Sequence, residues 1–465
     1  MPLTGGIPTA SELLAQERDD WLEAWSAFAS GLTLVDIPEP VVTHAKLVLL
    51  DTIGAMAAGS EEAEIKALNA RPGRDGPCAA VGGGFRNAET AALINGTAGT
   101  MLEIDEGNQY ARGHPGIQVI PAALATAVCE GRSGAELLTA IILGYEFGAR
   151  IGMASVLEPA MHPHGTWGAP AAALSVAKLK GLDPEGLAST VNIGSSLSLA
   201  TSRRTMIEGA TVRNAYTGFA NSMGVMAAEL QAAGLTGETD GIATVFGTVS
   251  AKDFSPQVML EQLGTRWEIA RNYFKRHAAC RYTHSALDAL DIIRQSAGRP
   301  LVPVEIEAIE VDTYIWAAQL DRAKPDNMLA AKFSLPFALA TAIKAGGTTL
   351  AAFREPNLSD PENFDLSRRV IVREDTGMTA QLPDKRPSQV KIRFADGAVL
   401  EAGTLTNRGD AESPYSADEV CEKYVEVATP VFGGVRAQEI KNSVLTINEA
   451  SDVLALNAML ANLPD

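Results

Sequence analysis

The sequence predicts a mainly α-helical protein with a smaller mixed α/β part, and two observations support this fold class. From residue 11 to about residue 246, apolar residues recur at helical spacing and runs of β-branched residues are few. Near residue 273 the pattern changes, and short stretches with strand-like alternation occur among helical ones. We therefore expect a large all-helical domain, residues 1–272 and 413–465, and a smaller α/β domain, residues 273–412, inserted before the C-terminal helices.

The helices of the first part are separated by glycine and proline signals. Pro38 and Pro40 precede the first clear helix, residues 41–58, and Gly59 follows it as a stop signal. Several helices are small and apolar on more than one face, which is typical of helices buried inside a large bundle. The other helices predicted here cover residues 91–102, 120–130, 134–153, 169–179, 186–200 and 215–233.

The segment from 273 to 412 mixes strands with helices. Residues 304–311 begin with the apolar/acidic alternation of a half-buried strand, and the alternation slips at Ile309. Asp396-Gly397 predicts a hairpin turn between two further strands. Those strands are 389–394 and 398–402, another is 370–372, and helices are expected at 284–295 and at 333–345, the latter with Pro336 in its interior.

After Pro414 the pattern becomes helical again. Ser416 and Glu419 form a capping-box signature at the start of SADEVCEKYVEVA, and residues 448–460 predict a last helix. We expect these C-terminal helices to pack back on the first part of the chain.

The charge balance excludes several classes of partner. The chain has 465 residues, 38 Lys and Arg against 56 Asp and Glu, and a formal net charge of -18. Nucleic acid and anionic membrane surfaces need basic surface, so neither is expected as a partner. The long apolar stretch at 137–154 is interrupted by Glu146 and Arg150 before it could span a bilayer, and the N-terminus turns acidic before any apolar run. We expect a soluble, cytoplasmic protein.

The four cysteines are scattered and form no CxxC pair, which argues against a zinc knuckle, an iron–sulfur centre and a disulfide framework.

A His/carboxylate metal set is the first alternative for the histidines, formed by His114, His162 and His164 with Glu103, Asp105 and Glu106. However, the chain has no HExxH helix, and an HPH step is not a recurrent ligand spacing. We expect no metal. The serine-hydrolase GxSxG, the dinucleotide GxGxxG and the P-loop are also absent.

Five of the six histidines fall in three short segments, residues 103–116, 161–168 and 275–284. Proton-transfer chemistry needs titratable groups on loops, held in place by a rigid scaffold such as a helical bundle. Taken alone, each segment could instead be a simple helix cap or turn. Arginines and lysines lie near the same segments, and arginine suits carboxylate capture. These cations are Arg213, Lys275-Arg276 and Arg281, whereas Arg203-Arg204 is interpreted as scattered surface charge.

These segments together resemble the MmgE/PrpD family, which includes 2-methylcitrate dehydratase, cis-aconitate decarboxylase and iminodisuccinate epimerase. The resemblance covers nearly the whole chain and rests on VVTHAKLVLLDTIGAMAAGS, ALINGTAGTMLEIDEGN, HPHGTWGAPAAALSVAKLKGL and CRYTHSALDAL. It implies an all-α domain with a smaller α/β lid domain, an active site between them, a homodimer, a small di- or tricarboxylate substrate, and no metal or organic cofactor.

The resemblance also implies the site residues. The catalytic set is Glu103, Asp105, His114, His162 and Lys275, and the substrate-binding set is Arg213, Arg281, His284, His164, Tyr216 and Cys280. Three positions depart from the family pattern: Arg213 stands where a lysine is expected, Tyr216 replaces a histidine, and Phe337 replaces a tyrosine of the aconitate decarboxylase branch. The last two departures count against decarboxylation.

The expected chemistry begins with removal of a proton next to a carboxylate, which leaves an aci-carboxylate that nearby cations bind. We assign that binding to Lys275 and Arg213, with Arg281 as a further candidate, and the proton transfers to His114 and His162 in either order. At least one of Glu103 and Asp105 would orient an imidazole. Trp167, Tyr216, Phe337 and residues 106–112 are the expected pocket walls.

The overall function predicted is a 2-methylcitrate dehydratase-like hydro-lyase. The alternatives are a dicarboxylate epimerase, a cis-aconitate-type decarboxylase and, outside enzymes, a non-catalytic helical carboxylate-binding protein.

Overall fold

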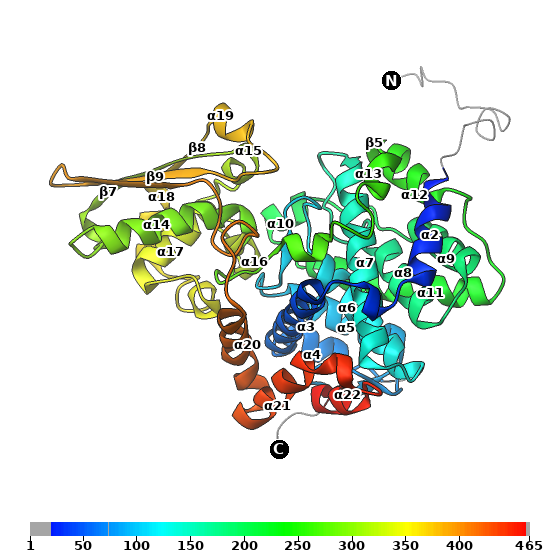
Figure 1. Ribbon diagram of the computed structural model, residues 1–465. Helices are drawn as coiled ribbons and strands as arrows, with labels where there is room; N and C mark the ends of the chain where they lie inside the picture. Colours follow the sequence, from blue (N-terminus) through cyan, green and yellow to red (C-terminus); the bar gives the residue numbers. More distant parts are fainter. Residues whose placement is uncertain (1–19, 73, 462–465) are drawn as a thin grey trace.

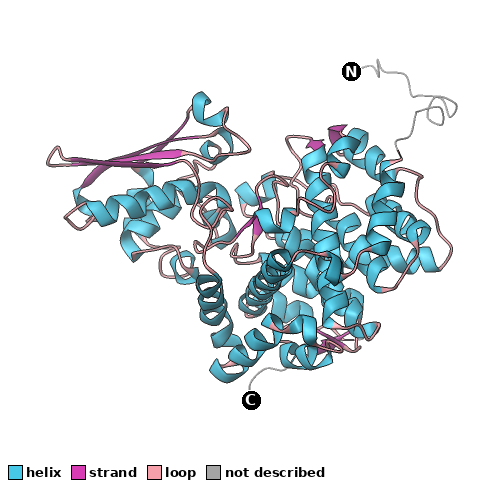
Figure 2. Ribbon diagram, viewed as in Figure 1, coloured by secondary structure: helices cyan, strands magenta, loops and turns pink. Residues whose placement is uncertain are grey.

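The computed structural model describes residues 20–72 and 74–461, and over this range the chain is mainly helical with a few small sheets (Figures 1 and 2). The predicted fold class is therefore confirmed. The part of the predicted helical stretch between residues 11 and 19 lies outside the described residues.

The first part of the chain is a bundle in which all the predicted helices are present. Most bounds agree with the prediction within three residues, and two differ by more. The helix expected at 120–130 starts at Pro115 and passes through Pro121, and the helix expected at 186–200 ends at Ser196. The main helices are α2 (Trp21–Gly31), α3 (Glu39–Ser60), α4 (Ala63–Asn69), α5 (Ala88–Thr100), α6 (Pro115–Cys129), α7 (Gly134–Ala154), α8 (Gly168–Leu179), α9 (Pro184–Ser196) and α11 (Val212–Ala232).

The small residues that make these helices apolar all round allow close packing. A Cβ atom on Gly96 of α5 would lie 2.8 Å from Cα of Gly218 on α11, so the two backbones meet where neither residue has a side chain. By length and composition α3 and α7 could cross a membrane, but 83% and 94% of their apolar windows are buried inside the protein. They are core helices of the bundle.

The α/β part contains a sheet of four strands in the order β10-β9-β7-β8. Only β7 and β8 run parallel, and the other neighbours are antiparallel. One face of the sheet is covered by α14 and α17 (Figure 1). The elements are α14 (His284–Ser296), β7 (Ile306–Thr313), α16 (Met328–Lys332), α17 (Leu335–Ala345), α18 (Pro361–Arg368), β8 (Val370–Glu374), β9 (Ser388–Phe394) and β10 (Val399–Thr404).

Two details of the sheet explain the sequence pattern. The predicted hairpin is confirmed, and Gly397 has the positive φ of 88° that such a turn favours. The alternation slips at Ile309 because the pairing of β7 with β9 is irregular between Ile306 and Ala308, so that Ile306 and Ile309 are both buried.

Three predictions about helices need correction. Pro336 is not interior, because α17 starts at Leu335 with Ser334 as its N-cap, and a proline is well tolerated in a first turn. The last helix, α22 (Leu454–Ala461), is shorter than the predicted 448–460. The helix α21 (Gly434–Leu445) was not predicted, because it starts within a glycine pair that signals a loop: Gly433 is its N-cap and Gly434 its first residue.

The C-terminal helices pack back on the bundle, as predicted. The helix α20 (Ala417–Phe432) has the expected capping box of Ser416 and Glu419 and lies beside α3. Nζ of Lys423 on α20 lies 2.5 Å from Oδ1 of Asp51 on α3, and both side chains are buried. The segment that enters the α/β part and the segment that leaves it therefore run close together, next to the loops that follow α5 and β6 (Asn272–Tyr273) (Figure 1).

Candidate active site

A cavity lies where the α/β part meets the helical bundle, and we call it the central cavity. Residues of both parts line it, and most of them are histidines, arginines or aromatic residues. The lining residues are Glu103, Arg112, His114, His162, Pro163, His164, Arg203, Met206, Arg213, Tyr273, Cys280, Arg281, Tyr282, Phe333 and Arg386.

Two buried lysines hold the loop that carries Glu103 and Asp105. Nζ of Lys332 donates to the carbonyl of Leu102 at 2.9 Å, and Nζ of Lys423 donates to the carbonyl of Ile104 at 2.5 Å. Glu103 itself has a φ of 55°, in the left-handed region that residues with a Cβ seldom adopt. The surrounding structure thus fixes this loop in an unusual conformation, which is common at functional sites.

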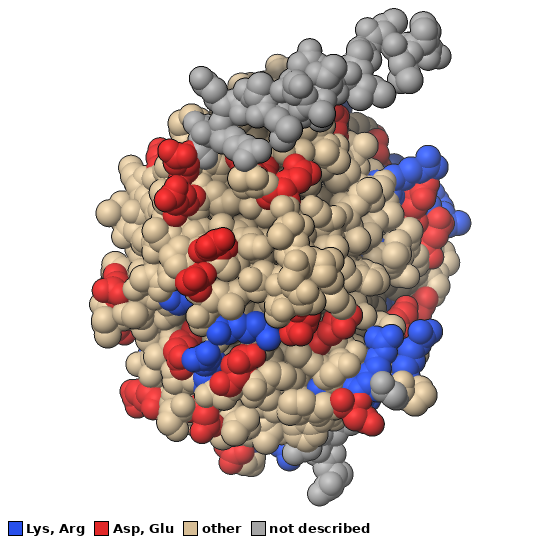
Figure 3. Space-filling model, turned by 90° about the vertical axis from the view of Figure 1, so that its right-hand side faces the viewer, with Lys and Arg blue, Asp and Glu red and all other residues tan. Residues whose placement is uncertain are grey.

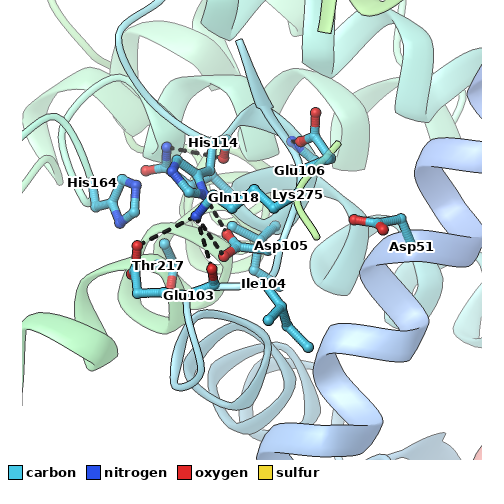
Figure 4. A network of polar contacts seen from close by, with 12 residues as sticks. Asp51, Glu103, Ile104, Asp105, Glu106, His114, Gln118, His164, Thr217 and Lys275 are labelled. Carbon is cyan, nitrogen blue, oxygen red and sulfur yellow. Dashed lines mark hydrogen bonds and ion pairs between the residues drawn. The ribbon is translucent and has the colours of Figure 1, made fainter. Parts of the chain in front are cut away.

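Asp105 and His114 form a buried pair at the wall of the cavity (Figure 4). Oδ2 of Asp105 accepts a hydrogen bond from Nδ1 of His114 at 2.6 Å, so the lone pair of the neutral imidazole is on Nε2. Nε2 lies 3.5 Å from the hydroxyl of Tyr273. Burial lowers the pKa of His114, while the charge of Asp105 opposes that shift. This arrangement can accept a proton at Nε2.

His162 differs from His114 in the ring nitrogen that carries the proton. The backbone N–H of His164 donates to its Nδ1 at 3.1 Å, and Nε of Arg213 lies 3.4 Å from its Nε2. A neutral imidazole has a single acceptor nitrogen, so only one of these contacts can be a hydrogen bond, and the shorter one leaves the proton on Nε2. Burial holds the pKa of His162 well below its usual range, and the charge of Arg213 adds to that effect. His162 can therefore present an N–H group.

His164 lies between the other two histidines of the cavity. Its ring centre is 4.6 Å from that of His162 and 4.8 Å from that of His114. Its Nδ1 atom is buried and makes no hydrogen bond within the described part of the chain. Burial, with a further contribution from Arg213, holds the pKa of His164 well below its usual range.

Glu103 joins two of the predicted cations. Its carboxylate forms an ion pair with Arg213, and its Oε2 lies 3.3 Å from Nζ of Lys275. Nζ of Lys275 is also 3.9 Å from Oδ1 of Asp105, and Figure 4 shows the amino group pointing at both acids. Burial opposes ionisation of Glu103, but Arg213 and Lys275 hold its pKa well below the usual range. Lys275 lies behind Glu103 and does not line the cavity.

The arginines give the cavity an excess of positive charge. Arg213 is paired with Glu103 and Arg281 with Asp410, and the guanidinium of Arg281 also stacks 4.3 Å from the ring centre of Tyr273. The other three cavity arginines have no carboxylate within ion-pair distance in the residues that the structure describes. They are Arg112, Arg203 and Arg386.

Arg386 is the most unusual of these cations, because it is only 2% exposed. Its Nη2 donates to the carbonyl of Gln109 at 3.1 Å, whereas Nε and Nη1 make no hydrogen bond to any described residue. Its guanidinium lies 5.7 Å from the ring of Tyr282 and 5.9 Å from the ring of Tyr273. A buried arginine without a counter-charge is costly unless an anion binds it. On the face of the bundle in Figure 3, by contrast, acidic and basic groups are interspersed.

The structure brings the sequence-predicted site residues to one place, in two groups. Seven of them line the cavity, namely Glu103, His114, His162, His164, Arg213, Cys280 and Arg281. The other four stand behind these: Asp105 behind His114, Lys275 behind Glu103, His284 with its Nδ1 3.0 Å from Nη1 of Arg281, and Tyr216 with its ring 6.1 Å from that of His162.

Sequence reasoning missed part of the lining and misplaced part of it. Arg203 lines the cavity although its sequence context suggested surface charge, while Arg204 is exposed and pairs with Glu208. The others that it missed are Met206, Tyr273, Tyr282, Phe333 and Arg386, whereas Arg112 belongs to the expected 106–112 wall. Arg386 is more than one hundred residues from the nearest histidine segment, and no local signal marks it.

The expectation that Trp167 and Phe337 form pocket walls is wrong. Trp167 is fully buried in the bundle, where its ring would be 2.6 Å from a Cβ on Gly113. Phe337 is fully buried in the α/β part, with its ring centre 6.3 Å from that of Phe353 and 5.9 Å from that of Phe364. Phe333, which follows the last residue of α16, lines the cavity instead.

The His/carboxylate metal set considered as an alternative is not assembled. Within residues 20–72 and 74–461, no group of three or more His, Cys, Asp or Glu side chains is arranged to hold a metal ion. The carboxylates nearest the histidines are instead engaged by Arg213, Lys275 and His114.

Comparison with known proteins gives matches along most of the chain. The model of the MmgE/PrpD N-terminal domain matches residues 23–256, and that of the MmgE/PrpD C-terminal domain matches residues 277–449. A cis-aconitate decarboxylase of Aspergillus terreus is 25% identical over 93% of this chain and 94% of its own length. A human cis-aconitate decarboxylase is 24% identical over 94% of each chain, and a cis-aconitate decarboxylase-like protein of Aspergillus oryzae is 25% identical over 92% of this chain and 94% of its own.

Proposed function

The chain belongs to the MmgE/PrpD family, and we propose that it is a lyase that removes a proton next to a carboxylate of a small di- or tricarboxylic acid. The observation that carries this proposal is the Asp105–His114 pair, which presents a buried imidazole to a cavity lined by five arginines. Arginines bind carboxylates, and a neutral histidine held by an acid is a suitable base.

His114 acts as the base in this proposal. Nε2 takes the proton from the substrate carbon, and Asp105 stabilises the imidazolium that forms while it keeps the ring in its tautomer. Because burial keeps His114 neutral near pH 7, the base is in its active form before substrate enters.

Arg213 stabilises the charge that develops when the proton leaves. The resulting aci-carboxylate is more negative than the bound substrate, and a cation in a buried site favours it. Glu103 and Asp105 together balance the charges of Arg213 and Lys275, so the excess positive charge of the cavity comes from Arg112, Arg203 and Arg386. Lys275 acts through Glu103 and Asp105 and positions both acids.

His162 is the proposed acid. Its Nε2–H group faces the same cavity and can donate its proton to a leaving hydroxyl, which departs as water while the carbon–carbon double bond forms. Arg213, whose Nε lies 3.4 Å from Nε2, stabilises the imidazolate left on His162, which then takes up the proton that His114 removed from the substrate. A base and an N–H donor in one cavity suit a hydro-lyase that acts on a citrate-like hydroxy acid, as in a 2-methylcitrate dehydratase. The unpaired Arg112, Arg203 and Arg386 would bind the carboxylates that do not react.

Decarboxylation of a cis-aconitate-like acid is the second candidate, because the relatives of the chain named above are cis-aconitate decarboxylases or resemble them. The Phe337 substitution no longer counts against it, since that side chain does not line the cavity. In this reaction the arginines would stabilise the carbanion left by carbon dioxide, and a histidine would protonate it.

Proton NMR in deuterated water separates these reactions. The enzyme is incubated with 2-methylcitrate, with cis-aconitate and with a chiral dicarboxylate, and the His114→Ala variant serves as the inactive control. An alkene formed from the hydroxy acid supports the hydro-lyase, and carbon dioxide released from cis-aconitate supports the decarboxylase. Deuterium uptake with inversion and without alkene identifies an epimerase. Binding of carboxylates without any exchange or turnover would contradict an enzymatic function.

Loss of activity in a chelator, restored by a divalent metal, would contradict the cofactor-independent reaction.

A further inference from the structure

We propose that Cys78 and Cys129 form a reversible dithiol–disulfide site, in which Cys129 reacts first with a peroxide and Cys78 then closes the disulfide. The site is separate from the central cavity. Cys129 is the last residue of α6, whereas His114 is the N-cap of the same helix, which places the thiol about 20 Å from the proposed base along the helix axis.

The geometry of the two thiols supports the pairing. Cys78 lies in β1 (Cys78–Ala79), which packs against the C-terminal half of α6, and its Sγ is 3.5 Å from Sγ of Cys129. A disulfide bond is about 2.05 Å long, so the two sulfur atoms must approach by about 1.5 Å. The side chain of Cys129 is exposed at a helix end, where rotation can supply this movement without a change in the core.

The two thiols differ in access, and this difference sets their roles. Cys129 is exposed and can meet a small oxidant, whereas Cys78 is 1% exposed, with its Sγ 3.3 Å from the carbonyl oxygen of Ala125. The hydrogen bond from Cys78 lowers the pKa of Cys129 to about 7. Burial and the nearby Glu130 and Glu229 oppose that shift, and Lys180 favours it. A thiolate at an accessible position is the reactive form of cysteine.

The chemistry balances with hydrogen peroxide as the oxidant. The Cys129 thiolate attacks one peroxide oxygen, the O–O bond breaks, and the products are Cys129 sulfenic acid and hydroxide, which takes up a proton to become water. The Cys78 thiol then attacks the sulfenyl sulfur, the S–O bond breaks, and the hydroxyl group leaves with the thiol proton as a second water. The two thiols lose two electrons and the peroxide gains them. A small dithiol reverses the reaction by exchange.

The bond would close a ring that contains the loop of Glu103 and Asp105 as well as α6. The β1 segment is already tied to the C-terminal helix α22, because Asn457 accepts from the N–H of Ala79 and donates to the carbonyl of Pro77, both at 2.8 Å. A cross-link at this point would therefore restrict the unfolded chain over residues 78–129 and raise the melting temperature.

Tryptic peptide mapping without reducing agent tests the proposal directly. The full chain is treated with hydrogen peroxide, and free thiols are alkylated before digestion. We expect peptides 75–86 and 113–132 to appear joined, with a mass lower by two hydrogens than their sum, and to separate after reduction. The oxidised protein should melt at a higher temperature than the reduced one, and dithiothreitol should remove the difference.

Single variants distinguish this order of events from simple proximity. In Cys78→Ser, Cys129 should stop at the sulfenic acid, trapped by dimedone, or be overoxidised. In Cys129→Ser, Cys78 should stay reduced because it is buried. The half-buried Cys421 serves as the internal control and should not enter an intramolecular disulfide. Failure to find the joined peptides in the wild-type chain, or oxidation of Cys78 in Cys129→Ser at the wild-type rate, would overturn the proposal.

Discussion

Oδ2 of Asp105 lies 2.6 Å from Nδ1 of His114, and both side chains are buried at the wall of the central cavity. This hydrogen bond places the lone pair of the neutral His114 ring on Nε2, the nitrogen that faces the cavity. It also connects the loop after α5, which carries Asp105, to the N-cap of α6, which is His114. The proposed chemistry depends on that link.

Replacing Asp105 with Asn should lower kcat by about 10²- to 10⁴-fold, the usual range for general acid–base catalysis, with little change in KM. The charge of Asp105 raises the pKa of His114, so its removal should lower that pKa further. The acidic limb of the pH–rate profile, where the base becomes protonated, should therefore move to lower pH. A profile of kcat/KM from pH 4 to 8 measures both effects. An unchanged limb would show that His114 is not the base.

Replacing His162 with Gln should abolish loss of water while proton abstraction continues, because the variant removes the proposed acid but keeps the base. We expect deuterium exchange at the substrate carbon, measured by NMR, without formation of alkene. The matched control is His277→Gln, since His277 bonds to Thr348 and Asp288 and does not line the cavity. Loss of exchange and dehydration together in His162→Gln would instead assign the proton abstraction to His162.

Replacing Arg386 with Met should raise KM by about 10- to 100-fold and leave kcat less affected, because hydrogen bonds to charged groups contribute about 1.5–3 kcal/mol. The same change should not lower the melting temperature, since it removes a buried charge that has no carboxylate partner in the described chain. Arg204→Met is the control, because Arg204 is exposed. A large loss of stability with an unchanged KM would mean that Arg386 has a structural role.

Replacing Lys423 with Met should destabilise the protein by about 3–5 kcal/mol, because the buried carboxylate of Asp51 loses its partner. The double variant Asp51→Asn with Lys423→Met should recover part of this loss, and urea unfolding of the four proteins measures the coupling. Lys66→Met, in an ion pair whose side chains are 58% and 44% exposed, should change the free energy of unfolding by less than about 1 kcal/mol. An additive cycle would contradict a direct interaction of Lys423 with Asp51.

Much of the fold could be predicted because it depends on local patterns. Helical spacing identified α3, α5 and α7, and the Asp396-Gly397 turn identified the hairpin of β9 and β10. The errors arose where one signal has two meanings. Pro121 marks a helix start by its residue type, yet it lies within α6. The Gly433-Gly434 pair signals a loop, yet α21 starts at Gly434.

The residues of the candidate site could be predicted in part, since histidines are few and lie in short segments with glycine, proline or arginine. The sequence alone did not predict which residue each of these side chains contacts. The same acidic loop could orient an imidazole through Glu103 or through Asp105, and only the folded chain assigns Asp105 to His114 and Glu103 to Arg213. Likewise, the 3.1 Å contact from the N–H of His164 to His162 selects one tautomer, which no spacing indicates.

The sequence by itself determined the fold class, the family resemblance and the need for a local cluster of cations in a chain of net charge -18. These depend on composition and on short-range periodicity, which act within one turn or one strand. The tertiary structure alone decided that Arg386 and Arg203 belong to that cluster, that Phe337 does not line the cavity, and that Cys78 lies 3.5 Å from Cys129. Each of these depends on which distant segments pack together, and that is set by the shape of the whole core.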